Sequence, residues 1–200
     1  MKLGVFLSGT GSNFKAIAAS VKRGFIPGEI TLVASNTPDA PGLATAQELG
    51  LSTAVFDRSL FDDGADFAQS VLNTLEQHQV DFIALAGYLR KVSPAVIRRF
   101  KGRIINIHPA LLPNFGGKGM FGMKVHDAVV RSGLPESGVT IHYVDEIYDH
   151  GEIIARRRVS LSPGETAESL RDKVLQEEHI IYGEVLRRMA VKLNKTGVLN

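Results

Sequence analysis

The sequence predicts an α/β protein with a doubly wound, mostly parallel sheet flanked by helices, and two observations support this prediction. Short apolar runs alternate with segments of helical composition over the first 110 residues, which is the pattern of a parallel sheet. One run, residues 82–86, is apolar at every position, as expected of a central strand that is buried on both faces. We see no linker and no repeat, so we expect a single domain.

The composition excludes several classes of protein. Of the 200 residues, 44% are hydrophobic, which is enough for a core of ordinary size. The 23 basic and 21 acidic residues nearly balance, so nucleic acid is not an obvious partner. The absence of cysteine excludes disulfides, thiolate catalysis and Cys-based metal sites. No apolar run approaches the roughly 18 residues of a membrane span, and the N-terminal apolar stretch is too short for a signal peptide, so we expect a cytoplasmic protein.

The first half of the chain is expected to contain five strands and four helices in alternation. Phe67, Val71 and Leu75 recur at four-residue spacing, which is typical of an amphipathic helix, and Pro94 suits the first turn of the next one. The predicted strands are 2–7, 30–34, 53–56, 82–86 and 104–108, and the predicted helices are 14–21, 43–49, 62–79 and 94–99.

The second half begins with an irregular segment, because residues 111–122 include four glycines. A short helix over 124–131 follows, in which His126 is interpreted as a surface or packing residue. We expect strands over 138–144 and 153–161, joined by an acidic loop, and a long helix over 166–193. The consecutive Arg156, Arg157 and Arg158 indicate that the last strand lies at an exposed edge.

A glycine-rich turn, residues 8–13, joins the first strand to the first helix. Glycines allow backbone N–H groups to approach a ligand, and a helix N-terminus favours negative charge, so this turn is a candidate phosphate site. It lacks the Gly-Lys-Ser/Thr of nucleoside triphosphate sites and the full dinucleotide pattern. The alternative is a purely structural turn in which Ser12 or Asn13 caps the helix.

The strand over residues 104–108 is the strongest candidate for an active-site element. Asn106 and His108 alternate with isoleucines, and residues two apart in a strand share a face. Pro109 lacks a ladder donor and should end the strand, which leaves the polar pair at the carboxyl end, where α/β sheets bind ligands. The alternative for His108 is a core histidine that bonds to backbone.

An amide beside an imidazole suits a reaction that builds negative charge on a carbonyl oxygen, because both groups can donate to the oxyanion. A carboxylate from the acidic loop, Asp145, Glu146 or Asp149, would orient the ring and raise its pKa. No Ser or Cys nucleophile is required if the substrate brings its own amine. The pattern does not indicate a catalytic metal.

The motifs closely resemble the folate-dependent formyltransferase superfamily, and within it the enzymes that act on glycinamide ribonucleotide. The resemblance rests on residues 106–113, which read Asn-Ile-His-Pro-Ala-Leu-Leu-Pro, on Asp149-His150-Gly151, and on the 8–13 turn. It implies a single Rossmann-like formyltransferase domain over 1–200, with a phosphate and substrate half (1–110) and a folate half (111–200). The implied reaction transfers the formyl group of 10-formyltetrahydrofolate to the amine of glycinamide ribonucleotide in purine biosynthesis, without a metal.

The resemblance also implies roles for individual residues. The catalytic trio would be Asn106, His108 and Asp149. The substrate phosphate would bind to Gly11, Ser12 and Asn13, and Glu178 would contact the glycinamide end, the alternative being a solvated helix carboxylate. The implied folate-binding residues are Leu89, Arg90, Lys91, Val92, Asn106, Asp145, Glu146, Ile147, Tyr148 and Asp149.

Two departures from the family pattern are visible. Gly64 stands where relatives often have an Arg that reaches the folate tail, so Arg58 or Arg90 would have to replace it. The loop after Pro113 is longer than in many relatives and lacks a clear match to their loop His or Thr.

The alternatives to the transferase function are a formyltetrahydrofolate hydrolase and a non-catalytic binding module. The expected oligomeric state is a monomer or homodimer.

Overall fold

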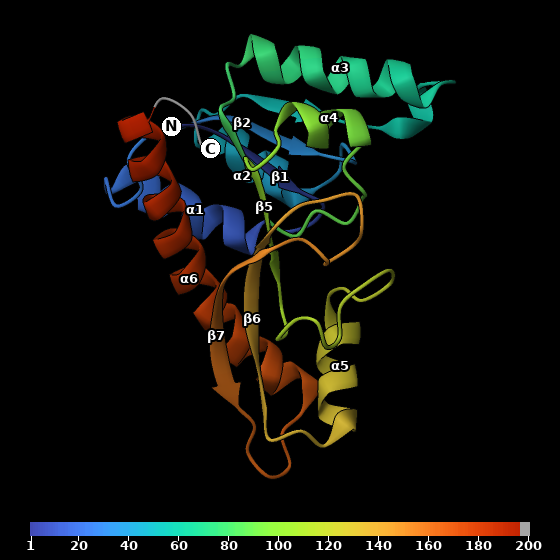
Figure 1. The fold of residues 1–200 in the computed structure, drawn as a ribbon, viewed down its shortest axis with the longest axis vertical. Helices are drawn as coiled ribbons and strands as arrows, with labels where there is room; N and C mark the ends of the chain where they lie inside the picture. The colour runs from blue at the N-terminus through green and yellow to red at the C-terminus, as the bar shows by residue number, and fades with distance from the viewer. Residues whose placement is uncertain (197–200) are drawn as a thin grey trace.

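The computed structural model describes residues 1–196, which form one seven-stranded sheet flanked by helices on both faces (Figure 1). The strand order is β3-β2-β1-β4-β5-β6-β7. Pairings among β1 to β5 are parallel, whereas β6 pairs antiparallel with β5 and β7. The strands are β1 (Lys2–Leu7), β2 (Glu29–Ser35), β3 (Thr53–Val55), β4 (Phe82–Leu85), β5 (Ile104–His108), β6 (Glu136–Tyr143) and β7 (Ile153–Ser160). The predicted doubly wound, mostly parallel sheet is confirmed.

The helices divide between the two faces of the sheet. Residues of α3 and α4 pack on one face, and residues of α1, α2, α5 and α6 pack on the other. The helices are α1 (Ser12–Lys22), α2 (Pro41–Glu48), α3 (Gly64–Gln77), α4 (Pro94–Arg99), α5 (Met123–Ser132) and α6 (Ala167–Thr196), with a short 3-10 turn, η1, at Arg58–Leu60. No helix among residues 1–196 is long and apolar enough to cross a membrane.

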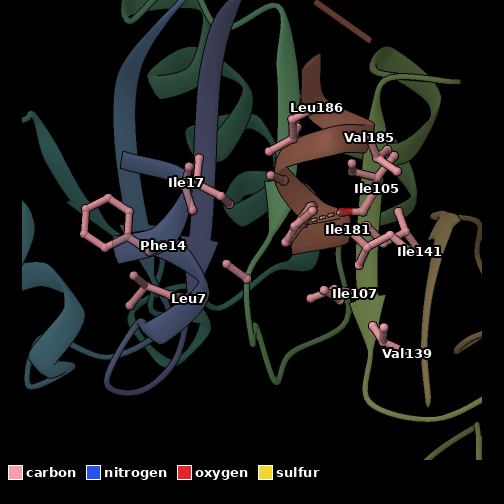
Figure 2. Close-up of a cluster of buried hydrophobic side chains, with 14 of the residues drawn as sticks. Leu7, Phe14, Ile17, Ile105, Ile107, Val139, Ile141, Ile181, Val185 and Leu186 are labelled. Carbon is pink, nitrogen blue, oxygen red and sulfur yellow. Dashed lines mark hydrogen bonds between the residues drawn. The ribbon is translucent and has the colours of Figure 1, made fainter. Parts of the chain in front are cut away.

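The larger core lies between the sheet and α6. Figure 2 shows Ile105 and Ile107 of β5 beside Ile141 of β6, with Ile181 and Val185 of α6 against them. Each of these side chains is at most 6% exposed, and such burial stabilises the fold by about 1.5–3 kcal/mol per residue. This packing fixes which way β5 faces, because Ile105 and Ile107 occupy the core on the α6 side.

The start of α1 differs from the sequence prediction. The helix begins at Ser12, and its N-cap is Gly11 in the left-handed conformation (φ 72°, ψ 35°) without any side-chain cap. Neither Ser12 nor Asn13 therefore caps the helix. A Cβ at residue 11 would lie 3.2 Å from the Gly42 Cα, so glycine is favoured there by both conformation and space.

The strand order reverses between β1 and β4. The chain continues from β1 to β2 and β3 on one side, and from β4 to β5 on the other. The carboxyl ends of β1, β4 and β5 consequently lie next to one another around a crevice, which is where open α/β sheets bind ligands. β7 is the last strand in the order and forms one edge of the sheet, as its three consecutive arginines predicted.

Candidate active site

A cavity of about 740 Å³ opens at the carboxyl ends of these strands, within the usual range for small-molecule sites. Ser12 and Asn13 of α1 border one part of it, together with Glu178 of α6. Residues 87–92 after β4 and residues 144, 145 and 147–149 after β6 border another part. Residues 117–122 of the glycine-rich loop form a further wall.

Asn106 and His108 border this cavity from β5, and Ile107 also reaches it. Asn106 and His108 both lie within 3.5 Å of the Asp149 carboxylate, so the prediction that they share one face is confirmed. Ile105 and Ile107 lie on the opposite face in the core, at 0% and 6% exposure. The β5 strand ends at His108, directly before Pro109, as the sequence predicted. The packing of the isoleucines therefore directs the amide and the imidazole into the cavity.

Asp149 is the loop carboxylate that meets this pair. Its Oδ2 lies 3.5 Å from the His108 Nδ1 and accepts a hydrogen bond from the Gly117 N–H at 2.9 Å. Its Oδ1 accepts from the Asn106 Nδ2 at 3.5 Å and lies 3.6 Å from the His142 Nε2. The structure thus brings Asn106, His108 and Asp149 together.

The protonation of His108 differs from the sequence prediction. Burial lowers the pKa of His108 below its ordinary value, although the Asp149 charge and the Phe115 carbonyl act in the opposite direction. Its Nε2 lies 2.8 Å from the Phe115 carbonyl oxygen. The prediction that the carboxylate gives His108 a raised pKa is therefore wrong, because the cost of charging the nearly dry ring outweighs the attraction.

Asp149 remains the charged member of the cluster. Burial acts to raise the pKa of its carboxyl, but a hydrogen bond from His142, the nearby His108 and the Gly117 N–H together hold it below the ordinary value. Phe115 and Asp149 both adopt positive φ angles, 56° and 53°. Such conformations are strained in non-glycine residues and concentrate at functional sites, which is consistent with a role for this cluster.

The turn after β1 meets α6 through a buried polar pair. The Asn13 Nδ2 donates to the Glu178 Oε2 at 2.8 Å, and both residues are at most 8% exposed. Burial raises the pKa of Glu178 to about 7, and the Asn13 bond only partly opposes this shift. Glu178 is therefore not a solvated helix carboxylate. The Asn13 Oδ1 is buried without a hydrogen-bond partner, so it can still accept a bond from a ligand.

Most residues that the resemblance assigned to folate border the cavity, with one exception. Residues 89–92, 145 and 147–149 line it, but Glu146 does not. The Glu146 carboxylate lies instead 3.5 Å from the Arg98 guanidinium, where both side chains are exposed. The structure therefore gives no support for Glu146 as a cavity residue.

The two arginines considered as replacements at Gly64 occupy different places. Arg90 borders the cavity. The Arg58 Nη2 lies 3.8 Å from the point that a Cβ at residue 64 would occupy, but Arg58 does not border the cavity. Arg90 is thus placed to meet a ligand directly, and Arg58 fills the space beside Gly64.

Sequence reasoning missed part of the cavity wall. His142 reaches the cluster, with its Nε2 3.2 Å from the Asn106 Nδ2, because β6 pairs Asn106 with His142. The alternation of Thr140 and His142 along β6 was the available signal. Of the two interpretations of His126, the packing residue holds, because the side chain is buried. Burial with the nearby Arg171 charge lowers its pKa to about 4. Among residues 1–196, no group of three or more acidic or imidazole side chains could hold a metal ion.

Comparison with known proteins identifies the family. The formyl transferase family model matches residues 1–186. The chloroplastic phosphoribosylglycinamide formyltransferase of Vigna unguiculata is 44% identical over 94% of this chain, which spans 60% of that relative's length. The phosphoribosylglycinamide formyltransferase of Bacillus subtilis is 34% identical, over 98% of this chain and 97% of the relative.

A solved structure agrees with these sequence matches. Glycinamide ribonucleotide transformylase 1 from Geobacillus kaustophilus superimposes with a TM-score of 0.88 at 40% identity, over 94% of this chain and 98% of that one. The chain therefore belongs to the formyl transferase family, in the group of phosphoribosylglycinamide formyltransferases that these relatives represent.

Proposed function

We propose that this protein transfers the formyl group of 10-formyltetrahydrofolate to the amine of glycinamide ribonucleotide, a step of purine biosynthesis. The observation that carries the proposal is the cluster of Asn106, His108 and Asp149 in a cavity that also reaches the start of α1. One end of this cavity suits a phosphate, and the cluster supplies groups for acyl transfer.

We place the nucleotide phosphate at Gly11, Ser12 and Asn13, where the first turn of α1 has no acidic residue and no side-chain cap. Glu178 would bind the glycinamide end. The folate would lie along residues 89–92, 145 and 147–149, so both halves of the chain would contribute to its site. Arg90 is the cation proposed to meet the folate tail.

In the proposed reaction the amine nitrogen attacks the formyl carbon and gives a tetrahedral adduct. The Asn106 amide and the His108 imidazole donate to its oxyanion. The bond from the carbon to N10 of the folate then breaks, and the proton lost by the attacking nitrogen passes to N10. Asp149 would carry that proton by way of a water molecule, because it remains a carboxylate beside Asn106 and His108.

His108 must change its hydrogen bonding during this reaction. The Phe115 carbonyl lies 2.8 Å from its Nε2 and occupies that nitrogen. We propose that the Nε2–H exchanges this bond for one to the oxyanion, whose negative charge favours the protonated ring. The neighbouring glycines at 116 and 117 would allow the loop to follow.

An absorbance assay tests the proposal. Conversion of 10-formyltetrahydrofolate to tetrahydrofolate is followed with and without glycinamide ribonucleotide, and the product that carries the formyl group is identified. Turnover that requires the nucleotide and formylates its amine supports the transferase. Turnover without the nucleotide that releases formate would favour the hydrolase, and binding without turnover would favour the binding module.

The cellular setting and assembly stay predictions. We propose a cytoplasmic protein that acts as a monomer or homodimer without a metal, although the Vigna unguiculata relative is named as chloroplastic. Sedimentation of the purified protein and fractionation of its cells would test the two points separately.

A further inference from the structure

The hydroxyl of Ser8 joins three strand ends behind the cavity. Ser8 follows β1 directly, and its Oγ donates to the Asn36 Oδ1 in the segment after β2. The same Oγ accepts a hydrogen bond from the Leu89 N–H at 2.8 Å, in the segment after β4. A second bond, from the Ser8 N–H to the Gly87 carbonyl at 3.1 Å, joins the same two segments.

These bonds link the two walls to which the two substrates are assigned. Ser8 opens the turn that leads to Gly11 and Asn13, the proposed phosphate site. Leu89 opens the wall of residues 89–92, which borders the cavity on the proposed folate side. Ser8 itself does not border the cavity, so its side chain acts on a ligand only through the residues that it holds.

The Leu89 end of this link lies between two anchored residues: the Tyr88 ring contacts Phe6, and Val92 is buried in the core. Gly87 adopts a left-handed conformation (φ 76°), which turns the chain out of β4, and Leu89 is 50% exposed. The segment after β4 has no regular structure until α4 begins at Pro94. Leu89 itself is half exposed, so the hydrogen bond to the Ser8 hydroxyl is the contact that ties its backbone N–H to the nucleotide turn.

We propose that Ser8 is a positioning residue that fixes the folate wall, residues 89–92, in place relative to the nucleotide turn, residues 8–13. The inference rests on the proposed function, because it takes that wall as the folate side. Loss of one neutral hydrogen bond changes an equilibrium by about 3- to 10-fold. Removal of the hydroxyl should therefore weaken folate binding by about that factor, while the turn at Gly11 to Asn13 keeps its backbone bonds.

The test compares Ser8→Ala, Ser8→Thr and the control Ser132→Ala. The Ser132 hydroxyl likewise accepts from a backbone N–H, that of Leu134 at 3.4 Å, and donates to the Val129 carbonyl at 2.6 Å. Ser132 is the last residue of α5 and does not border the cavity. We expect Ser8→Ala to raise the folate KM about 3- to 10-fold, with kcat and the nucleotide KM within twofold of the wild type. Ser8→Thr keeps the hydroxyl and should retain the wild-type KM, as should the control.

Direct binding separates this inference from the proposed function. The Kd of tetrahydrofolate, measured by calorimetry on the same variants, requires no turnover and should follow the KM. An unchanged Kd and KM in Ser8→Ala would overturn the positioning role, as would a parallel fall of kcat and both affinities with a lower Tm. If the wild type bound tetrahydrofolate but showed no nucleotide-dependent turnover, the proposed reaction would fail while the Ser8 comparison still gave an answer.

Discussion

Replacement of Glu178 by Gln should make the protein more stable while it impairs substrate binding. Glu178 is 8% exposed and faces Asn13, and burial raises its pKa to about 7 from an ordinary value of 4.5. In the unfolded chain the carboxyl ionises near pH 4.5, whereas in the folded protein it keeps its proton to about pH 7. The unfolded state therefore binds fewer protons across this window, and stability falls as the pH rises.

The size of this effect follows from the pKa difference. About 2.5 pH units at 1.36 kcal/mol per unit correspond to roughly 3 kcal/mol, lost between pH 4.5 and 7. Glutamine cannot ionise, and its amide can accept from the Asn13 Nδ2 and donate to the Asn13 Oδ1, which has no partner. The free energy of unfolding of Glu178→Gln, measured relative to the wild type, should therefore rise by about 3 kcal/mol from pH 4 to pH 8, which corresponds to about 6–12 °C in Tm.

Thermal unfolding of both proteins at several pH values measures this difference. The matched control is Glu168→Gln, an exposed glutamate in the first turn of the same helix, which should show no such dependence on pH. The nucleotide KM should rise in Glu178→Gln but not in Glu168→Gln, since only Glu178 borders the cavity. A stability difference that stayed flat from pH 4 to pH 8 would refute the assignment of a buried, protonated Glu178.

Three further predictions concern the cluster and the nucleotide turn. Asn106→Ala and His108→Ala should each lower kcat about 100- to 1,000-fold with small changes in KM, and steady-state kinetics that showed near-normal kcat for either would remove its role. Asp149→Asn should be less stable than the wild type at pH 7. The lowered pKa of the Asp149 carboxyl stabilises the folded protein at pH values above 3.8, the ordinary pKa, and this stabilisation is lost as the pH falls further. Urea unfolding should therefore show the free energies of unfolding of the two proteins converging in acid. Gly11→Val should mainly weaken nucleotide binding, since residue 11 has φ 72° and lies against Gly42; calorimetry that gave an unchanged nucleotide Kd in a folded variant would exclude the phosphate site.

The shared face of Asn106 and His108 could be predicted from the sequence because a strand has a period of two. Ile105 and Ile107, which alternate with them, indicate the core side, and Pro109 marks the end of the strand. No knowledge of the partner strands was needed. The fold class was predictable for a similar reason, since the alternation of apolar runs and helical segments is a local property.

The contacts of Asp149 could not be derived from local pattern. Three acidic residues occur in the loop, and which of them meets β5 depends on the antiparallel pairing of β6 and on the positive φ at Asp149. Resemblance selected Asp149, and it also selected Glu146, whose carboxylate lies beside Arg98 instead. Loop side chains one residue apart can point to opposite sides, so assignments by neighbourhood fail there.

The protonation of His108 and of Glu178 depends on burial by segments distant in the chain. The sequence shows a carboxylate that can raise the pKa of His108, but not the surrounding side chains and backbone that exclude water from the ring. In the same way, nothing in the local sequence of α6 indicates that Glu178 faces Asn13 across 165 residues. Desolvation is a property of the assembled cavity, and it decided the direction of both shifts.

The central claim is that the formyl group passes from folate to the nucleotide amine at the cluster of Asn106, His108 and Asp149. The most direct measurement uses 10-formyltetrahydrofolate labelled with ¹³C in the formyl group and follows the label by NMR in the presence of glycinamide ribonucleotide. The account predicts that the label appears on the nucleotide amide in amounts equal to the tetrahydrofolate formed, and that His108→Ala slows this transfer at least 100-fold. Label that accumulated as free formate, or transfer at the wild-type rate in His108→Ala, would contradict it.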